Sequence, residues 1–280
     1  MDFVTNDGIK INYQIKGNGK PIIFVAGFGG YQEVWTMQVD YFTKMGYQVI
    51  TYDHRNFGRS QRTKNDHTLQ RLTDDLIELV QCLGIKQAVF VGHSLGGSLL
   101  FNLIKTEPDL VKLAVIVDQT PFMLNTSDWS YGFMNYTLSN YVREAKMVPA
   151  VHETLHGIDN RVAMKLNNAR IDHPFSRSDN FDLLCEHIAH DWRGVVKDSQ
   201  VPIDVIAAVQ GPYYNFLFAK WMTTQNDRVN MALVDNCGHD IMAEVPDRFN
   251  QILRHFLLKN RYLYLFSFCC FLVILLWQVM

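Results

Sequence analysis

Runs of apolar residues, and stretches in which apolar and polar residues alternate, divide the chain into predicted strands. Residues 8–15 alternate between apolar and polar positions, which is typical of an edge strand with one exposed face. Six continuous apolar runs predict strands that are buried on both faces, as in a parallel sheet. These runs cover residues 21–26, 47–52, 88–91, 113–117, 203–208 and 229–234.

Helical spacing separates several of these predicted strands. In residues 69–83 the apolar positions recur every three or four residues, and Gly84 follows, as at the end of a helix. Residues 246–258 show the same pattern near the end of the chain. Because alternating strands and helices form right-handed crossovers, we predict a mainly parallel, doubly wound α/β sheet built from residues 1–120 and 200–260.

The alternation stops in residues 121–199, which are rich in Met, Asn, Tyr, Trp and His. An insertion at this point would lie over the carboxyl ends of the strands, so we expect a mainly helical cap that forms a substrate pocket. Four of its apolar and aromatic side chains are candidates to line that pocket, namely Trp129, Tyr131, Phe133 and Met134. The alternative is that these side chains hold the cap together.

The composition limits the classes of function. A chain of 280 residues with 48% hydrophobic residues can bury one sizeable core. The net charge of −2, with Lys and Arg scattered along the chain, gives no support for binding to nucleic acid. The five cysteines lack the spacing of a metal site, so we expect no metal. Residues 1–7 do not resemble a secretory signal peptide, which favours a reducing, cytosolic setting.

The end of the chain differs from the rest. Residues 262–280 contain no charged residue and consist mostly of Leu, Phe, Val, Ile, Cys and Trp. As a helix they would be roughly 28 Å long, close to the ~30 Å apolar thickness of a bilayer. Lys259 and Arg261 precede the run, which favours a cytoplasmic flank. We therefore expect a membrane anchor that holds the domain on the cytoplasmic side and close to the bilayer. An apolar helix packed on the domain is the alternative.

The most informative motif is Gly92-His93-Ser94-Leu95-Gly96. It follows the predicted strand at 88–91 and leads into a predicted helix. A G-x-S-x-G sequence between a strand and a helix is typical of a nucleophile elbow, in which a tight turn exposes the serine hydroxyl above the sheet. We therefore predict Ser94 as a nucleophile, with a purely structural turn as the alternative.

A serine hydroxyl is a weak nucleophile at neutral pH and needs a base beside it. Among the ten histidines, His239 is the best candidate, because it lies between the last predicted strand and the last predicted helix. The alternative is a histidine in a surface loop.

Backbone N–H groups are expected to stabilise the negative oxygen that forms during acyl transfer. The candidates are Leu95, directly after the serine, and Phe28, in the glycine-rich segment 27–30 that follows an early strand. The glycines of that segment do not match the G-x-G-x-x-G spacing of a dinucleotide site, so we expect no NAD or FAD.

Together these motifs resemble the α/β-hydrolase superfamily, in the branch that contains cofactor-free haloperoxidase-like enzymes and small esterases. Residues 53–60 add a resemblance to the D-x-R-G-x-G-x-S loop of that family. The resemblance covers about residues 8–258. It implies an α/β-hydrolase fold without metal or cofactor, and the order Ser, acid, His along the chain.

The acid that would orient His239 departs from the common pattern of that superfamily. Many relatives carry it after the penultimate strand, but residues 207–214 of this chain contain no carboxylate. Other relatives carry it after the strand that follows the elbow helix, where this chain has Asp118. A carboxylate at that edge of the sheet can reach the imidazole. Asp118 is therefore the expected acid, and a loop-bracing aspartate is the alternative.

The expected function is hydrolysis of a moderately apolar, small carboxylic ester through an acyl-enzyme. The same residues would serve a perhydrolase of the cofactor-free haloperoxidase type, in which peroxide replaces water. A non-catalytic ligand-binding module on the same fold is the third alternative, suggested by the missing carboxylate in residues 207–214 and by the apolar tail.

Overall fold

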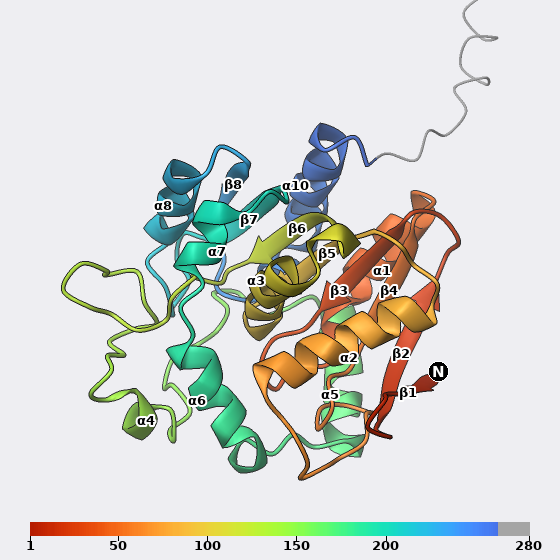
Figure 1. Cartoon of the computed structure of the whole chain (residues 1–280), viewed down its shortest axis with the longest axis horizontal. Helices are drawn as coiled ribbons and strands as arrows, with labels where there is room; N and C mark the ends of the chain where they lie inside the picture. Colours follow the sequence, from red (N-terminus) through yellow and green to blue (C-terminus); the bar gives the residue numbers. More distant parts are fainter. Residues whose placement is uncertain (263–280) are drawn as a thin grey trace, which may run out of the picture.

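An eight-stranded sheet forms the centre of the computed structural model, which describes residues 1–262 (Figure 1). The strand order is β1-β2-β4-β3-β5-β6-β7-β8. The strands β1 and β2 pair antiparallel, as do β2 and β4, and every other neighbouring pair is parallel. The strands are β1 (Asp2–Val4), β2 (Lys10–Lys16), β3 (Pro21–Val25), β4 (Gln48–Tyr52), β5 (Ala88–His93), β6 (Val111–Val117), β7 (Ile203–Ala208) and β8 (Val229–Val234). The predicted mainly parallel α/β sheet is confirmed.

Helices cover both faces of this sheet, and α2 and α3 lie in front of the strands in Figure 1. The longer helices are α1 (Thr36–Lys44), α2 (Leu69–Cys82), α3 (Leu95–Thr106), α5 (Asn160–Asp172), α6 (Phe181–Ala189), α8 (Leu217–Gln225) and α10 (Pro246–Lys259). The shorter ones are η1 (Gln32–Trp35), η2 (Pro108–Leu110), α4 (Tyr141–Glu144), η3 (Ser178–Asn180), α7 (Arg193–Asp198) and α9 (Ile241–Glu244).

The continuous apolar strands produce two core layers, because successive side chains of a strand point to opposite faces of the sheet. In β5, Phe90 packs in the layer that includes α2 and α3, whereas Val89 and Val91 pack in the layer that includes α1 and α10. All three side chains are fully buried. Burial on both faces explains why these strands read as unbroken apolar runs.

Local signals set the ends of the predicted helices. The Thr68 hydroxyl accepts a hydrogen bond from the Arg71 N–H at 3.1 Å and caps the start of α2. Gly84 follows the end of α2 with a φ of 66°, a conformation that glycine adopts at little cost. Pro246 begins α10, where its missing N–H leaves no hydrogen bond unmade. The two predicted helical patterns are therefore confirmed to within a residue or two.

The segment between β6 and β7 holds helices α4 to α7 and long connections, and no strand lies within it. Its buried residues join both core layers. Leu183 and Ile188 of α6 belong to the layer with α2, and Val162 and Leu166 of α5 belong to the layer with α1. The division into a core and a separate cap at 121–199 stays a prediction.

The predicted membrane anchor requires a correction. Apart from Tyr262, residues 262–280 lie outside the described part of the chain. Tyr262 is buried on the domain, since its hydroxyl donates to the Pro21 carbonyl at 2.9 Å and its carbonyl accepts from the Tyr47 hydroxyl at 2.8 Å. No helix within residues 1–262 has the length and apolar character needed to cross a bilayer. Membrane anchoring, and the cytoplasmic-facing localisation built on it, are therefore not supported.

The expected approach of the pocket to a bilayer also fails on geometry. Tyr262 binds at Pro21, which is the first residue of β3. Ser94 follows the last residue of β5, a strand parallel to β3. The last described residue therefore lies at the amino ends of the parallel strands, whereas Ser94 lies at their carboxyl ends.

Candidate active site

Ser94 stands in a strained turn between β5 and α3. Its φ of 53° and ψ of −120° lie outside the regions that non-glycine residues normally adopt. Two glycines make room for this turn. A Cβ atom on Gly92 would lie 2.4 Å from the carbonyl oxygen of Gly96, and a Cβ atom on Gly96 would lie 2.4 Å from that of Val25. The turn thus requires glycine at both positions, as the elbow motif predicts.

Asp118 and His239 are joined by a short hydrogen bond across the carboxyl edge of the sheet. The distance from His239 Nδ1 to Asp118 Oδ2 is 2.7 Å, and both side chains are buried. The other carboxylate oxygen, Oδ1, accepts from the Ala208 N–H at 2.9 Å. Because an ionised carboxylate only accepts hydrogen bonds, Nδ1 carries the hydrogen and Nε2 keeps its lone pair.

The backbone holds both members of this pair. Asp118 directly follows β6 and has a φ of 45°, and its N–H donates to the Ile206 carbonyl at 2.8 Å. The His239 N–H donates to the Glu153 carbonyl at 2.6 Å. Burial alone would lower the pKa of His239, but the hydrogen bond and negative charge of Asp118 outweigh burial and raise that pKa above its ordinary value of 6.5.

The loop after β3 lies beside Ser94. A Cβ atom on Gly27 would lie 3.1 Å from the Cβ of Ser94, so the backbone leading to Phe28 passes close to the serine. The Phe28 ring packs edge-on against Phe57 and Phe175, with centroid distances of 6.0 and 5.1 Å. Leu95 begins α3, and the first N–H groups of a helix have no partner within the helix. Both predicted N–H groups therefore belong to backbone that borders the serine.

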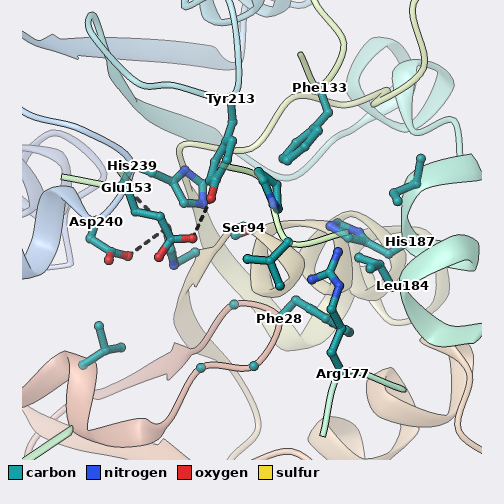
Figure 2. Close-up of a pocket in the computed structure, with 18 of the residues that line it drawn as sticks. Phe28, Ser94, Phe133, Glu153, Arg177, Leu184, His187, Tyr213, His239 and Asp240 are labelled. Atoms are coloured by element: carbon teal, nitrogen blue, oxygen red, sulfur yellow. Dashed lines mark hydrogen bonds and ion pairs between the residues drawn. The ribbon is translucent and has the colours of Figure 1, made fainter. Parts of the chain in front are cut away.

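Ser94 and His239 line one pocket with a volume of about 190 Å³, shown in Figure 2. Phe133 is the only one of the four predicted substrate-binding residues that lines this pocket. Trp129 is buried elsewhere, packed edge-on against Tyr131 and Trp221 at 5.0 and 4.8 Å. Its indole N–H donates to the Phe122 carbonyl at 2.9 Å.

Met134 also differs from the expectation. It is 39% exposed and does not line the pocket, and its N–H donates to the Tyr213 carbonyl at 2.7 Å. Trp129 and Tyr131 thus correspond to the alternative in which side chains hold this segment together, whereas Met134 matches neither expectation.

Sequence reasoning missed the contribution of residues 207–214. In place of a carboxylate this segment supplies Tyr213, whose hydroxyl donates to Glu153 Oε1 at 2.7 Å. The Tyr213 ring stacks on Phe133 and meets His239 edge-on, with centroid distances of 4.7 and 4.8 Å. Two consecutive tyrosines, separated from a buried strand by residues 209–212, are the signal that could have pointed to this wall of the pocket.

Two carboxylates lie on the same side of the pocket as His239 (Figure 2). These are Glu153 and Asp240, and the Asp240 Oδ1 atom is 3.8 Å from His93 Nε2. Burial, together with the charge of Glu153, raises the pKa of Asp240 to about 6. Arg177 and His187 stand apart from them on another wall of the pocket (Figure 2).

Metal ligation finds no obvious place in the described residues. Within residues 1–262, no group of three or more His, Cys, Asp or Glu side chains is arranged to hold a metal ion. Cys237, close to His239 in sequence, is fully buried and points its Sγ atom toward the Val234 carbonyl at 3.5 Å.

Comparisons with known proteins give consistent matches. A family model described as alpha/beta hydrolase fold matches residues 20–150. A proposed carbamate hydrolase from Caulobacter sp. (strain K31) is 37% identical over 250 residues, which cover 84% of this chain and 90% of that protein. A non-heme chloroperoxidase from Streptomyces lividans is 33% identical over 127 residues, or 44% of this chain. The chain matches less than half the length of that chloroperoxidase, 46%.

Among solved structures, an esterase from Exiguobacterium antarcticum superposes with a TM-score of 0.79 at 17% sequence identity. The match covers 91% of this chain and 98% of that esterase. At this level of identity the match shows a shared fold.

Proposed function

Because the chain belongs to the α/β-hydrolase family, in its haloperoxidase-like branch, we propose that it is a serine hydrolase that cleaves a carboxylic ester through an acyl-enzyme. The observation that carries the proposal is the buried hydrogen bond from His239 to Asp118 beside the same pocket as Ser94. A histidine oriented by a carboxylate is the base that a serine nucleophile requires.

In the proposed reaction, Ser94 Oγ attacks the ester carbonyl while His239 Nε2 takes its proton. Asp118 holds the imidazole in the tautomer with hydrogen on Nδ1 and stabilises the imidazolium that forms. The N–H groups of Phe28 and Leu95 donate to the negative oxygen of the tetrahedral intermediate. His239 then protonates the leaving alcohol, and water activated by the same base releases the acid.

The pocket favours a small substrate with an apolar part. Its volume of about 190 Å³ is below the roughly 300–1,000 Å³ of most ligand pockets. Phe28, Phe133 and Leu184 provide apolar surface on its walls. In this proposal, residues 121–199 act as a cap, since Phe133, Arg177 and Leu184 belong to this segment.

Covalent labelling with a fluorophosphonate tests the proposal. Wild-type protein should label with one equivalent and should hydrolyse 4-nitrophenyl esters, whereas Ser94→Ala should do neither. Ser98→Ala is the matched control, because Ser98 is buried in α3, the helix that follows Ser94, and does not line the pocket. It should label like wild type. Absence of labelling and of turnover in folded wild-type protein would refute the proposal in favour of a ligand-binding module.

The similarity to a non-heme chloroperoxidase supports a second candidate activity. Hydrogen peroxide in place of water would attack the acyl-enzyme and release a peracid, with the same residues in the same roles. Peracid formation measured alongside ester hydrolysis distinguishes the two. A negligible rate with peroxide removes the second candidate and leaves the first.

A further inference from the structure

Arg177 provides a positive charge on the wall of the pocket that lies apart from Glu153 and Asp240 (Figure 2). Its Nε and Nη2 atoms donate to the Ala145 carbonyl at 3.2 and 2.8 Å, and Nη2 also reaches the Met147 carbonyl at 3.3 Å. The guanidinium lies 5.6 Å from the centre of the Phe28 ring. One side of the guanidinium is therefore anchored by backbone, while the residue borders the same space as Ser94.

Within the described chain, no carboxylate lies within ion-pair distance, 4.0 Å, of Arg177. Of the four other arginines in residues 121–199, three each have one, in the pairs Arg143–Glu144, Arg161–Asp159 and Arg193–Asp191. The fourth, Arg170, also lines the pocket, where its positive charge partly offsets the rise in the pKa of Asp240. Burial lowers the pKa of Arg177, whereas Asp191 raises that of Arg193. A half-buried guanidinium without a counter-charge is costly, and an anionic ligand would offset that cost.

His187 on α6 supplies a second polar group to the same wall. It is 2% exposed, and its Nδ1 atom has no hydrogen-bond partner among residues 1–262. Burial lowers the pKa of His187 to about 3, so the ring is neutral at neutral pH and can donate one hydrogen bond. Figure 2 shows His187 beside Arg177, with Leu184 next to them.

We propose that Arg177, with His187 beside it, binds a carboxylate carried by the substrate, so that the ester cleaved at Ser94 is itself a monoanion. This inference rests on the proposed function. Three of the five N–H groups of Arg177 donate to backbone carbonyls, which leaves the two on Nη1 to donate to a carboxylate. The other arginine of the pocket, Arg170, already acts on Asp240 on the His239 side, and Glu153 adds a second carboxylate there. The carboxylate of the substrate is therefore directed toward Arg177, and the ester carbonyl stays near Ser94.

Matched substrates that differ only in this charge provide the test. One pair places the charge on the acyl side: mono-4-nitrophenyl adipate against 4-nitrophenyl hexanoate. The other places it on the alcohol side: 4-acetoxybenzoate against 4-acetoxybenzamide. For wild type we expect kcat/KM to favour the anion of at least one pair by about 10- to 100-fold, the range for a hydrogen-bonded charge.

Variants of Arg177 show where this preference originates. In Arg177→Gln, the kcat/KM of the anionic substrate should fall to about that of the neutral substrate. Arg177→Lys keeps the charge and should retain part of the preference for the anion. If Arg177 only held the backbone at Ala145 and Met147, its replacement would instead lower kcat/KM equally for both substrates. Arg161→Gln is the control, because Arg161 is exposed and does not line the pocket. The proposal is overturned if neither pair shows a preference in wild type, or if the preference survives Arg177→Gln.

A binding measurement keeps this test separate from the proposed function and from the folding of the Arg177 variants. In calorimetry, Ser94→Ala should bind the anion about 10- to 100-fold more tightly than its neutral partner in at least one of two pairs: monomethyl adipate against methyl hexanoate, or 4-acetoxybenzoate against 4-acetoxybenzamide. Equal binding within both pairs overturns the carboxylate site. If the protein labels with fluorophosphonate but shows no preference for anions, only the carboxylate site is refuted. If it neither labels nor hydrolyses any ester, the proposed function is refuted, and calorimetry still tests the carboxylate site separately.

Discussion

The carboxyl edge of the sheet and the segment between β6 and β7 face the same pocket, but they are held in place differently. At the edge of the sheet, backbone geometry fixes the side chains: Ser94 and Asp118 both have positive φ and lie directly after β5 and β6. In the segment, short helices and loops supply single side chains such as Phe133, Arg177 and His187.

This difference separates chemistry from selectivity. Changes at the edge of the sheet act on groups with one permitted geometry, so they should abolish the reaction or the fold. Changes in the segment should alter which substrate is accepted, or only the stability, according to whether the side chain lines the pocket. The following predictions test that separation, from the largest expected effect to the smallest.

Replacing the acid at the edge of the sheet should have the largest effect. An asparagine at position 118 can still accept from the Ala208 N–H, but its NH₂ group would donate to His239 Nδ1. The hydrogen would then move to Nε2, and the base would be lost. We expect Asp118→Asn to lower kcat by about 10⁴-fold with the fold intact. Asp204→Asn is the control, since Asp204 is buried in β7 and bonds to Asn230 and Asn260. A loss of only a few-fold at position 118 would exclude it as the acid.

Within residues 121–199, replacing an aromatic residue that does not line the pocket should lower stability and leave the activity of the folded protein unchanged. Trp129→Ala removes a buried indole and its hydrogen bond to Phe122, and we expect the free energy of unfolding to fall by about 3–5 kcal/mol. The kcat/KM of the folded fraction should stay near that of wild type. Phe133→Ala should instead raise KM, because Phe133 lines the pocket. Denaturant unfolding and ester kinetics on both variants measure the contrast, and a raised KM in Trp129→Ala would contradict it.

Replacing a glycine by alanine in each of the two regions tests how much room the surrounding atoms leave for a Cβ atom. Gly96→Ala would place its Cβ atom 2.4 Å from the Val25 carbonyl oxygen. We expect a loss of about 3 kcal/mol in the free energy of unfolding. Gly194→Ala is the matched change in helix α7, where a Cβ atom meets no heavy atom within 4 Å. It should stabilise the protein by about 0.5–1 kcal/mol. Equal effects of the two changes in thermal unfolding would contradict the proposed difference.

The smallest effect concerns pH. His239 acts as a base only when neutral, so kcat/KM should rise with pH through a pKa above the ordinary 6.5.

The free energy of unfolding should change in the opposite direction and fall as pH rises. The bond between protonated His239 and Asp118 contributes fully below pH 6.5 and is lost as pH rises through the raised pKa. This contribution should be absent in Asp118→Asn, which the pH dependence of the free energy of unfolding measures in the two proteins. If the kcat/KM of wild type instead rose with an apparent pKa at or below 6.5, Asp118 would not raise the pKa of His239.

The sequence pattern predicts the sheet and the residues that follow directly from its strands. Ser94 and Asp118 are identifiable because each terminates a buried apolar run, and the glycines of the elbow mark where backbone approaches backbone. Hydrophobicity alone does not distinguish a pocket wall from internal packing. Trp129 and Phe133 look equivalent in sequence, yet Trp129 finds a carbonyl partner inside the domain and Phe133 faces the pocket.

Long-range placement explains the remaining errors. Arg177 and His187 lie in a segment without strand periodicity, and their significance depends on a counter-charge that is missing in three dimensions. Tyr262 continues into an uncharged run and therefore resembles the start of a membrane segment. Its hydroxyl and carbonyl bond to Pro21 and Tyr47, which are more than two hundred positions earlier.

The anchoring of Tyr262 determines how the protein can be attached to a solid support. Pro21 opens β3 and Gly27 lies just beyond its end, so the strand separates the Tyr262 contact from the serine. A resin coupled next to residue 262 would therefore hold the protein with its pocket toward the bulk liquid. Coupling at Val148, which is 72% exposed and lines the pocket, would instead turn the entrance onto the resin.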